Sequence, residues 1–221
     1  EEAERMSDAR IAAVYAGIAG DHIRSLNCRG VIAVSGPDNE ITAHDEARVI
    51  ETAKAVSIPM DREIIHVLPQ SFVVDDQPGV KNPIGMSGVR LEADVHMVTG
   101  AVTSAQNICK SIRRAGVEVV DLVLEPLASS YAVLSPEEEE MGVVLVDVGG
   151  GTTDIAVFYD GSIRHTAVVG LGGENVTHDV SIGLRTPLKQ AEETKRQHGC
   201  AFRTLVSKEE SIEVPGLAGR P

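Results

Sequence analysis

The stretch from residue 143 to residue 173 constrains the fold more than any other, because it alternates apolar runs with glycine clusters. We expect strands over residues 143–146, 155–159 and 162–169. Asp160-Gly161, between the last two, is a strong signal for a two-residue hairpin. A second glycine cluster at residues 170–173 leads into a helical pattern. The order is therefore strand, glycine turn, strand, tight turn, strand, glycine turn, helix.

This order separates the possible phosphate-binding designs. In a P-loop or a dinucleotide-binding fingerprint the glycine turn opens a helix, whereas here a strand follows it, without a P-loop lysine. A glycine turn between strands can still direct backbone N–H groups at an anion. Asp147 and Asp154 bracket the turn with carboxylates that suit a hydrated Mg²⁺ ion. The alternative is a glycine-rich hairpin with two turn-favouring Asp residues, and the motif alone leaves both interpretations open.

Composition limits the class of protein. The chain has 221 residues, is 43% hydrophobic but only 3% aromatic, and its aliphatic core favours an α/β arrangement with buried strands. A formal charge of −13 argues against nucleic-acid binding, which needs clustered Lys and Arg. Three widely spaced cysteines without a CxxC pair indicate neither a disulfide framework nor a zinc site, and fit a reducing cytosol. No run of apolar residues approaches the length of a membrane span.

The first half of the chain predicts a compact group of strands around one helix. Thr42 is a plausible N-cap for a helix that runs to Ile58, where Pro59 stops it, and Pro69 indicates an edge position or a bulge. The expected elements are a helix end at 1–6, a buried strand over 11–20, one or two strands over 24–34, a β-rich segment at 64–74, a loop at 75–88 and a half-buried strand over 90–98. Residues 31–99 therefore form a strand–helix–strand–strand insert.

The second half predicts helices around the glycine-rich stretch. Pro126 marks the first turn of a helix, and four consecutive Glu residues indicate a solvated linker. The expected elements are a helix from 103 to near 116, a strand over 117–124, a helix over 125–134, a linker over 135–141, and helices over 174–183 and 187–197.

Four motifs together resemble the actin/Hsp70/hexokinase ATPase superfamily and, within it, the bacterial actin-like cell-division family FtsA. Residues 147–154 (DVGGGTTD) resemble the second phosphate motif of the superfamily, and residues 125–132 (EPLASSYA) resemble its first connecting helix. Residues 14–23 (VYAGIAGDHI) and 66–75 (HVLPQSFVVD) are similar to FtsA itself. The insert falls where FtsA carries an extra subdomain.

The resemblance implies an actin-like (ribonuclease H-like) α/β ATPase fold, truncated at both ends, with an inserted small α+β subdomain. Its implied segments are part of the first actin-like subdomain (1–30), the insert (31–99), a return to the first subdomain with the connecting helix (100–140), and the start of the second subdomain with the phosphate hairpin (141–221).

The resemblance also implies roles for single residues. Gly149, Gly150, Gly151, Thr152 and Thr153 would line the phosphates of ATP. Asp147 would hold Mg²⁺ through water with support from Asp154, and Glu125 would position the attacking water. Gly172 and Gly173 would lie near the nucleotide, and Glu192 with Lys195 would contact the ribose. From the residues alone, Glu125 is equally a helix N-terminal carboxylate, Gly172-Gly173 a helix start, and Glu192–Lys195 an exposed ion pair.

Three family features do not occur in these 221 residues: the first phosphate loop, the adenosine motif and a C-terminal amphipathic helix that binds membrane. We therefore expect weak or no nucleotide binding by this chain alone, and an isolated fragment without activity. For the family as a whole the resemblance implies at most slow ATP hydrolysis.

As a function, the resemblance implies a protein that polymerises like actin and tethers the tubulin-like protein FtsZ to the inner face of the cytoplasmic membrane at the septum. The insert would contact other subunits or division proteins. Two alternatives are an FtsA-like scaffold ATPase of pilus assembly and a small-molecule kinase of the same superfamily. The kinase alternative lacks a candidate catalytic base outside the phosphate motif.

Overall fold

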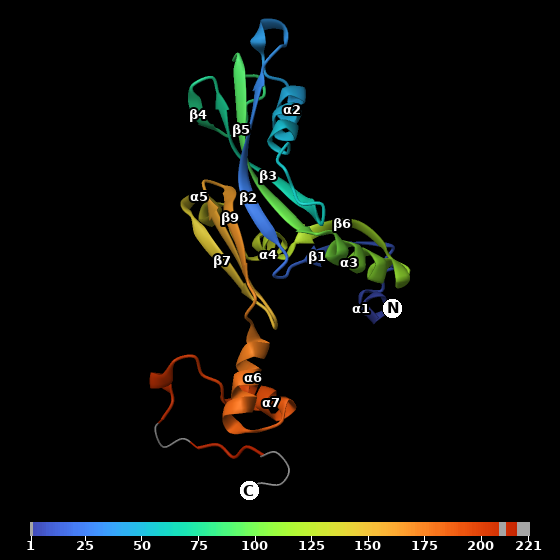
Figure 1. The fold of residues 1–221 in the computed structure, drawn as a ribbon, viewed down its shortest axis with the longest axis vertical. Coiled ribbons are helices and arrows are strands. Elements are labelled where there is room, and N and C mark those ends of the chain that lie inside the picture. Colours follow the sequence, from blue (N-terminus) through green and yellow to red (C-terminus); the bar gives the residue numbers. More distant parts are fainter. Residues whose placement is uncertain (1, 208–210, 216–221) are drawn as a thin grey trace. The chain divides into compact units, whose positions relative to one another are not determined.

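The computed structural model describes residues 2–207 and 211–215, and the chain divides into two compact units. The first unit comprises Glu1–Asp147 with Asp154–Val168, and the second comprises Val148–Thr153 with Val169–Pro221. The chain therefore crosses between the units three times, and two of the crossings flank the glycines after Asp147. Figure 1 shows the order of the elements along the chain.

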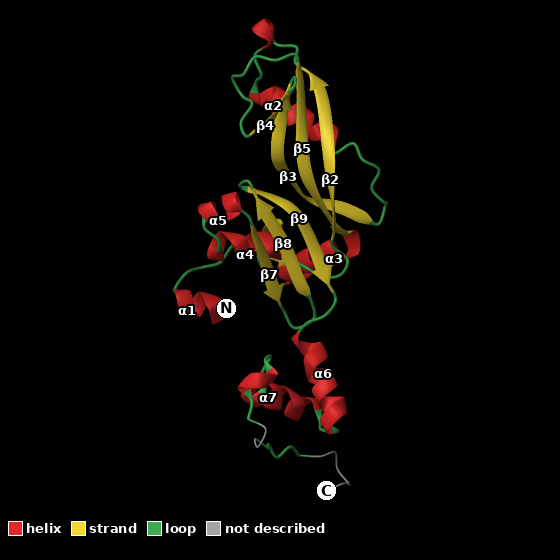
Figure 2. Cartoon of the chain, turned by 90° about the vertical axis from the view of Figure 1, so that its left-hand side faces the viewer, coloured by secondary structure: helices red, strands yellow, loops and turns green. Residues whose placement is uncertain are grey.

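A four-stranded antiparallel sheet with one covering helix forms the largest layer of the first unit (Figures 1 and 2). The strand order is β2 (Arg24–Ala33), β5 (Arg90–Ala101), β3 (Arg62–Val74) and β4 (Gln77–Val80), and α2 (Ala43–Ala53) packs on β2 and β5. Gly30 permits this close packing, since a Cβ atom there would lie 2.2 Å from the carbonyl oxygen of Val49. The buried core between them is mostly aliphatic and includes Val49, Leu91, Val95 and Met97.

Two parallel strands and two helices make a second layer of the first unit. Strand β1 (Ala13–Ile18) pairs with β6 (Glu118–Leu124), while α1 (Glu2–Ser7) precedes them and α3 (Val102–Arg114) and α4 (Glu125–Val133) contact them. Their buried core includes Ile18, Val98, Ala105 and Leu124. Because β6 ends where α4 begins, Glu125 stands at the junction of strand and helix.

The glycine-rich stretch supplies a three-stranded sheet in the order β7 (Val143–Val148), β8 (Thr153–Tyr159) and β9 (Ser162–Val169). Asp160 and Gly161 have φ angles of 55° and 63°, which is the geometry of a type I′ hairpin and confirms the expected tight turn. Leu145, Ala156, Phe158 and Ile163 form its small core.

Polar side chains of the four-stranded sheet reach the outer strand β9. The Gln70 side-chain amide donates to the carbonyl oxygen of Ile163 at 2.8 Å, and Nε2 of His96 lies 3.0 Å from the Thr166 hydroxyl. Burial, with a smaller effect of nearby His165, lowers the pKa of His96 to about 4, so its ring is neutral at the pH of a cell. The edge of β9 is therefore occupied by side chains rather than by another strand.

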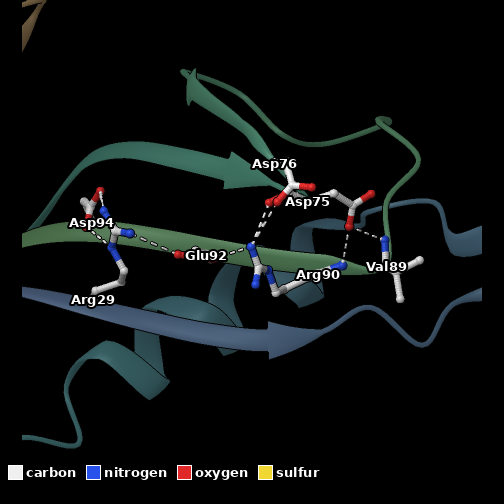
Figure 3. A network of polar contacts seen from close by, with 7 residues as sticks. All are labelled: Arg29, Asp75, Asp76, Val89, Arg90, Glu92 and Asp94. Carbon is white, nitrogen blue, oxygen red and sulfur yellow. Dashed lines mark hydrogen bonds and ion pairs between the residues drawn. The ribbon is translucent and has the colours of Figure 1, made fainter.

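The face of β2 and β5 that points away from α2 carries a network of ion pairs (Figure 3). Arg29 pairs with Asp94 at 2.7 Å and with Glu92 at 3.1 Å, and Arg90 pairs with the same Glu92 at 3.1 Å. Asp75 accepts the backbone N–H of Arg90 at 2.8 Å. Since Arg29 and Asp94 are direct partners across the two strands, the network favours the observed register, in which Gly30 faces α2.

The second unit is built around a helix pair. Helix α6 (Gly173–Leu184) packs against α7 (Leu188–His198), and a 3₁₀ turn, η2 (Arg203–Leu205), follows. Arg185 ends α6 in the left-handed conformation with φ 53°. Because α6 ends at Leu184 and α7 begins at Leu188, the expected break between two helices is confirmed. Thr186, within this break, is 1% exposed.

Several expected elements need correction. The capping box of Thr42 and Asp45 starts α2 as expected, but the helix ends at Ala53, five residues before Ile58. The expected loop over 75–88 contains β4, and the expected linker over 135–141 contains a short helix, α5 (Pro136–Met141). Helix α5 forms because Ser135 and Glu138 make a capping box, a local signal that outweighs the repulsion between the glutamates.

Two expectations about burial were also wrong. Strand β5 is buried along nearly its whole length rather than on one face, because it lies between β2 and β3, beneath α2, with His96 directed at β9. Strand β1 is not buried throughout: only Ala16 and Ile18 are buried, and the side chain of Tyr15 is 70% exposed. Pro69 lies at a register shift between β3 and β5, which confirms the bulge rather than the edge position. The boundaries of the four implied segments stay predictions.

Candidate functional site

The first glycine turn, residues 148–153, belongs to the second unit. The N–H of Gly149 donates to the carbonyl oxygen of Thr152 at 2.9 Å and closes the turn. The Thr153 hydroxyl donates to the carbonyl oxygen of Leu171 at 2.8 Å, which ties the end of the turn to the second glycine turn, residues 170–173. The five residues that the resemblance assigned to phosphate binding therefore form one closed loop.

The two glycine turns are joined through the start of α6. The N–H of Gly173 donates to the carbonyl oxygen of Gly149 at 2.9 Å, and the N–H of Glu174 donates to that of Gly150 at 2.8 Å. Gly172 lies against the same loop, since a Cβ atom there would be 2.4 Å from the Gly150 oxygen. The first N–H groups of a helix lack partners within the helix, and here the loop carbonyls satisfy them.

This pairing determines where the amides of the loop point. A trans peptide is planar, and its N–H points opposite to its carbonyl oxygen. Because the oxygens of Gly149 and Gly150 face α6, the N–H groups of Gly150 and Gly151 face away from it. Neither N–H has a hydrogen-bond partner among the described residues. Two adjacent amides directed to the same side, without Cβ atoms around them, are the kind of backbone arrangement that can bind an anion, and we call this pair the anion nest.

A cavity of about 490 Å³ lies beside these turns within the second unit. Lys195 on α7 reaches into the junction, where its ammonium group donates to the carbonyl oxygen of Gly173 at 2.9 Å and pairs with Glu192 at 2.6 Å. The cavity is lined by Gly150, Gly173, Glu174, Thr177, His178, Leu188, Lys189, Glu192 and Lys195.

Three carboxylates of the predicted site residues, Glu125, Asp147 and Asp154, lie in the first unit. Asp154 is 4% exposed, and Asp147 accepts a hydrogen bond from the Ser129 hydroxyl of α4 at 3.2 Å. Partial burial raises the pKa of Glu125, and the negative charges of Asp154 and Asp147 raise it further. Glu125 also lies directly on β1, because a Cβ atom on Gly17 would be 3.0 Å from its Cγ.

The raised pKa of Glu125 predicts a pH-dependent change in stability. The folded state disfavours the ionised carboxylate, so the wild type loses stability as the pH rises from the ordinary value of 4.5 through the raised pKa. Glu125→Gln removes this cost. We therefore expect the variant to be more stable than the wild type at pH 7, and the difference to vanish below pH 4.5.

Chemical unfolding of the complete protein at several pH values measures this difference. Glu118→Gln, at an exposed position at the start of β6 in the same unit, removes the same formal charge and is the control. If the difference in unfolding free energy between Glu125→Gln and the wild type were the same at every pH, ionisation of Glu125 would not be the cause of the lost stability.

The predicted site residues thus fall into two groups. Glu125, Asp147 and Asp154 lie in the first unit, and the nine others lie in the second. Sequence reasoning missed Thr177, Gly17 and the cavity residues His178 and Lys189. Thr177 lies one helical turn after Gly173, and that spacing was the available signal. Within residues 2–207 and 211–215, no three His, Cys, Asp or Glu side chains form a metal-binding group.

Among the helices described, none is long and apolar enough to cross a membrane.

Comparisons with known proteins give the family. A family model described as "SHS2 domain inserted in FTSA" matches residues 20–99, and one described as "Cell division protein FtsA" matches residues 144–221. The chain is 52% identical over 221 residues to the cell division protein FtsA of Pseudomonas aeruginosa and 44% identical over 221 residues to that of Escherichia coli K12. Both alignments cover 100% of this chain and 52% of the relative. The chain thus spans about half the length of these relatives.

Among solved structures, a PilM–PilN type IV pilus biogenesis complex matches with a TM-score of 0.62 and 18% identity, over 89% of this chain and 54% of that chain. At that identity the match shows the fold alone. The pilus protein therefore shares the architecture of this chain, while the sequence of the chain is similar to that of FtsA. The fold is the actin-like ATPase fold. The two family models and relatives matched along the whole chain lead to one conclusion: the chain belongs to the FtsA family of cell-division proteins.

Proposed function

We propose that this chain is the central part of an actin-like cell-division protein that binds Mg·ATP, polymerises, and tethers FtsZ to the cytoplasmic membrane at the septum. The observation that carries the nucleotide part is the outward-facing pair of N–H groups at Gly150 and Gly151. The cell-division part is supported by the family, and the relatives are named as cell-division proteins.

The residues present fit a magnesium nucleotide. The first glycine turn would hold phosphate oxygens through its backbone amides and the hydroxyls of Thr152 and Thr153. Asp147 would hold Mg²⁺ through water, and Asp154 would support it. When bound, the ion neutralises phosphate charge and orients the phosphate chain. The cavity beside Gly173, with Glu192 and Lys195 on its wall, is large enough for part of the nucleotide.

Hydrolysis would be slow. Glu125 is the carboxylate that would orient a water molecule, and its raised pKa would make it a better proton acceptor than an ordinary glutamate. No other group of the site activates a nucleophile. ATP would therefore serve to control assembly rather than to drive chemistry.

Recruitment of FtsZ to lipid tests this proposal. The full-length protein, mixed with FtsZ and vesicles containing anionic lipid, is expected to carry FtsZ into the vesicle pellet with Mg·ATP. Vesicles with FtsZ alone are the control. Failure to recruit FtsZ would contradict the tethering role, and failure of the full-length protein to bind Mg·ATP in calorimetry would contradict the nucleotide role. The isolated 221-residue chain is expected to bind weakly, and submicromolar affinity would overturn that expectation.

A further inference from the structure

His66 on β3 has no part in the proposed function, yet its ring reaches the layer that carries Glu125. Nε2 of His66 accepts the backbone N–H of Leu124 at 2.9 Å. Leu124 is the last residue of β6, and α4 begins at the next residue, Glu125. A side chain of the four-stranded sheet therefore holds the backbone immediately before this carboxylate.

A bulge in β3 gives the His66 side chain this direction. The register of β3 against β5 shifts between Ile64 and His66, so Ile65 is an extra residue on β3. Successive side chains of a regular strand point to opposite faces, and a bulge changes their direction. Here Ile65 packs on the core that includes Leu124, and His66 bonds to the Leu124 amide. Two neighbouring side chains of β3 thus reach the layer of β1 and β6.

The hydrogen bond from Leu124 requires a neutral imidazole. Nε2 accepts only while it carries no proton, so the proton of the neutral ring is on Nδ1. Burial lowers the pKa of His66, and the nearby carboxylate of Asp121 on β6 opposes this shift without cancelling it. The ring is therefore neutral at the pH of a cell and can act as an acceptor.

The end of β6 depends on this contact. Within residues 2–207 and 211–215, β6 pairs with β1 alone. Leu124 is the N-cap of α4, and its apolar side chain makes no cap hydrogen bond. The Glu125 side chain lies against Gly17 of β1, where a Cβ atom would be 3.1 Å from Oε1. Gly17 thus restricts the Glu125 side chain, and His66 holds the backbone that precedes it.

We propose that His66 is a positioning residue for ATP hydrolysis, which holds the Leu124 amide at the end of β6 and thereby fixes the Glu125 carboxylate against Gly17. The proposal rests on the proposed function, because it assumes that Glu125 orients the water that attacks ATP. It gives the motif at residues 66–75 a task at the site, through a strand of the four-stranded sheet.

Three variants of His66 separate the hydrogen bond from the packing of the ring. His66→Leu fills a similar space and cannot accept a hydrogen bond. His66→Gln is the matched control, because its side-chain oxygen extends about as far as Nε2 and accepts without titrating. His66→Asn carries the same amide on a shorter side chain that does not reach Leu124, and it replaces His66→Leu if that variant fails to fold. Thermal unfolding reports whether each variant is folded.

Phosphate release by the full-length protein, together with calorimetry of Mg·ATP binding, tests the proposal. We expect His66→Leu to lower kcat by about tenfold or more, because a displaced carboxylate no longer orients the water. Its affinity for Mg·ATP is expected to stay within about twofold of the wild type, since the contact acts on the transition state alone. His66→Gln is expected to keep kcat within about threefold of the wild type.

Several results would overturn the role of His66. They are an unchanged kcat in folded His66→Leu, an equal loss of kcat in His66→Gln, a parallel loss of Mg·ATP affinity, or a wild type that binds Mg·ATP without hydrolysing it. A wild type that does not bind Mg·ATP would instead contradict the proposed function.

Hydrogen exchange without nucleotide tests the contact itself. We expect faster amide exchange over residues 122–126 in His66→Leu and wild-type exchange there in His66→Gln. This measurement does not depend on ATP, so it distinguishes a failure of the contact from a failure of the proposed function. Unchanged exchange in His66→Leu would show that His66 does not hold the end of β6.

Discussion

Replacing Gly172 by alanine is expected to reduce the affinity of the full-length protein for Mg·ATP by at least about a hundredfold. The new Cβ atom would lie 2.4 Å from the Gly150 carbonyl oxygen and 2.6 Å from that of Gly149. Both are backbone atoms, so no side-chain rotation relieves the overlap. The two glycine turns must separate, and the bonds from Gly173 and Glu174 that orient the nest are lost. Two such bonds at roughly 1–1.5 kcal/mol each correspond to about a hundredfold.

Gly170→Ala is the matched control for this variant. It lies in the same glycine turn, and a Cβ atom there would have no neighbour within 4 Å. We expect it to bind Mg·ATP within about threefold of the wild type, by calorimetry. Thermal unfolding of both variants reports whether the fold is kept. A Gly172→Ala protein that is folded and binds Mg·ATP normally would show that the contact between the turns does not set the phosphate site.

Replacing Asp147 by asparagine is expected to remove the magnesium dependence of nucleotide binding. Asparagine keeps an oxygen that can accept the hydrogen bond of Ser129, so the change isolates the lost charge. A water-mediated magnesium site depends on carboxylate charge. We expect affinity for ATP with Mg²⁺ to fall by about 10- to 100-fold, to the level measured with excess chelator, and ATP hydrolysis to fall below detection.

Asp76→Asn removes the same charge from a fully exposed side chain at 103% relative exposure and is the control. Titrations with and without Mg²⁺ should give the wild-type ratio of affinities for this variant. If Asp147→Asn retained a normal magnesium effect, Asp154 or another group would have to hold the ion, and the assignment of Asp147 would be wrong.

Local rules explain why much of the fold was predictable. Asp160-Gly161 tolerates positive φ and therefore turns a hairpin, Thr42 caps α2, and Pro126 suits the first turn of α4. Each of these effects acts over a few residues. The same reasoning failed for β4 and α5, because a short strand paired to β3 and a charged helix with a capping box have weak apolar patterns.

The sequence by itself determined the order of the elements apart from β4 and α5, the glycine turn between two strands, and the family. Only the tertiary structure decided how that turn is used. Its amides point outward because residues 20 or more positions later, Gly172 and Gly173, occupy its carbonyl side. Thr177 and Lys195 enter the site because two helices pack together. The direction of a backbone amide and the contacts of a side chain depend on which distant segments of the chain pack together. A local sequence pattern does not specify that packing.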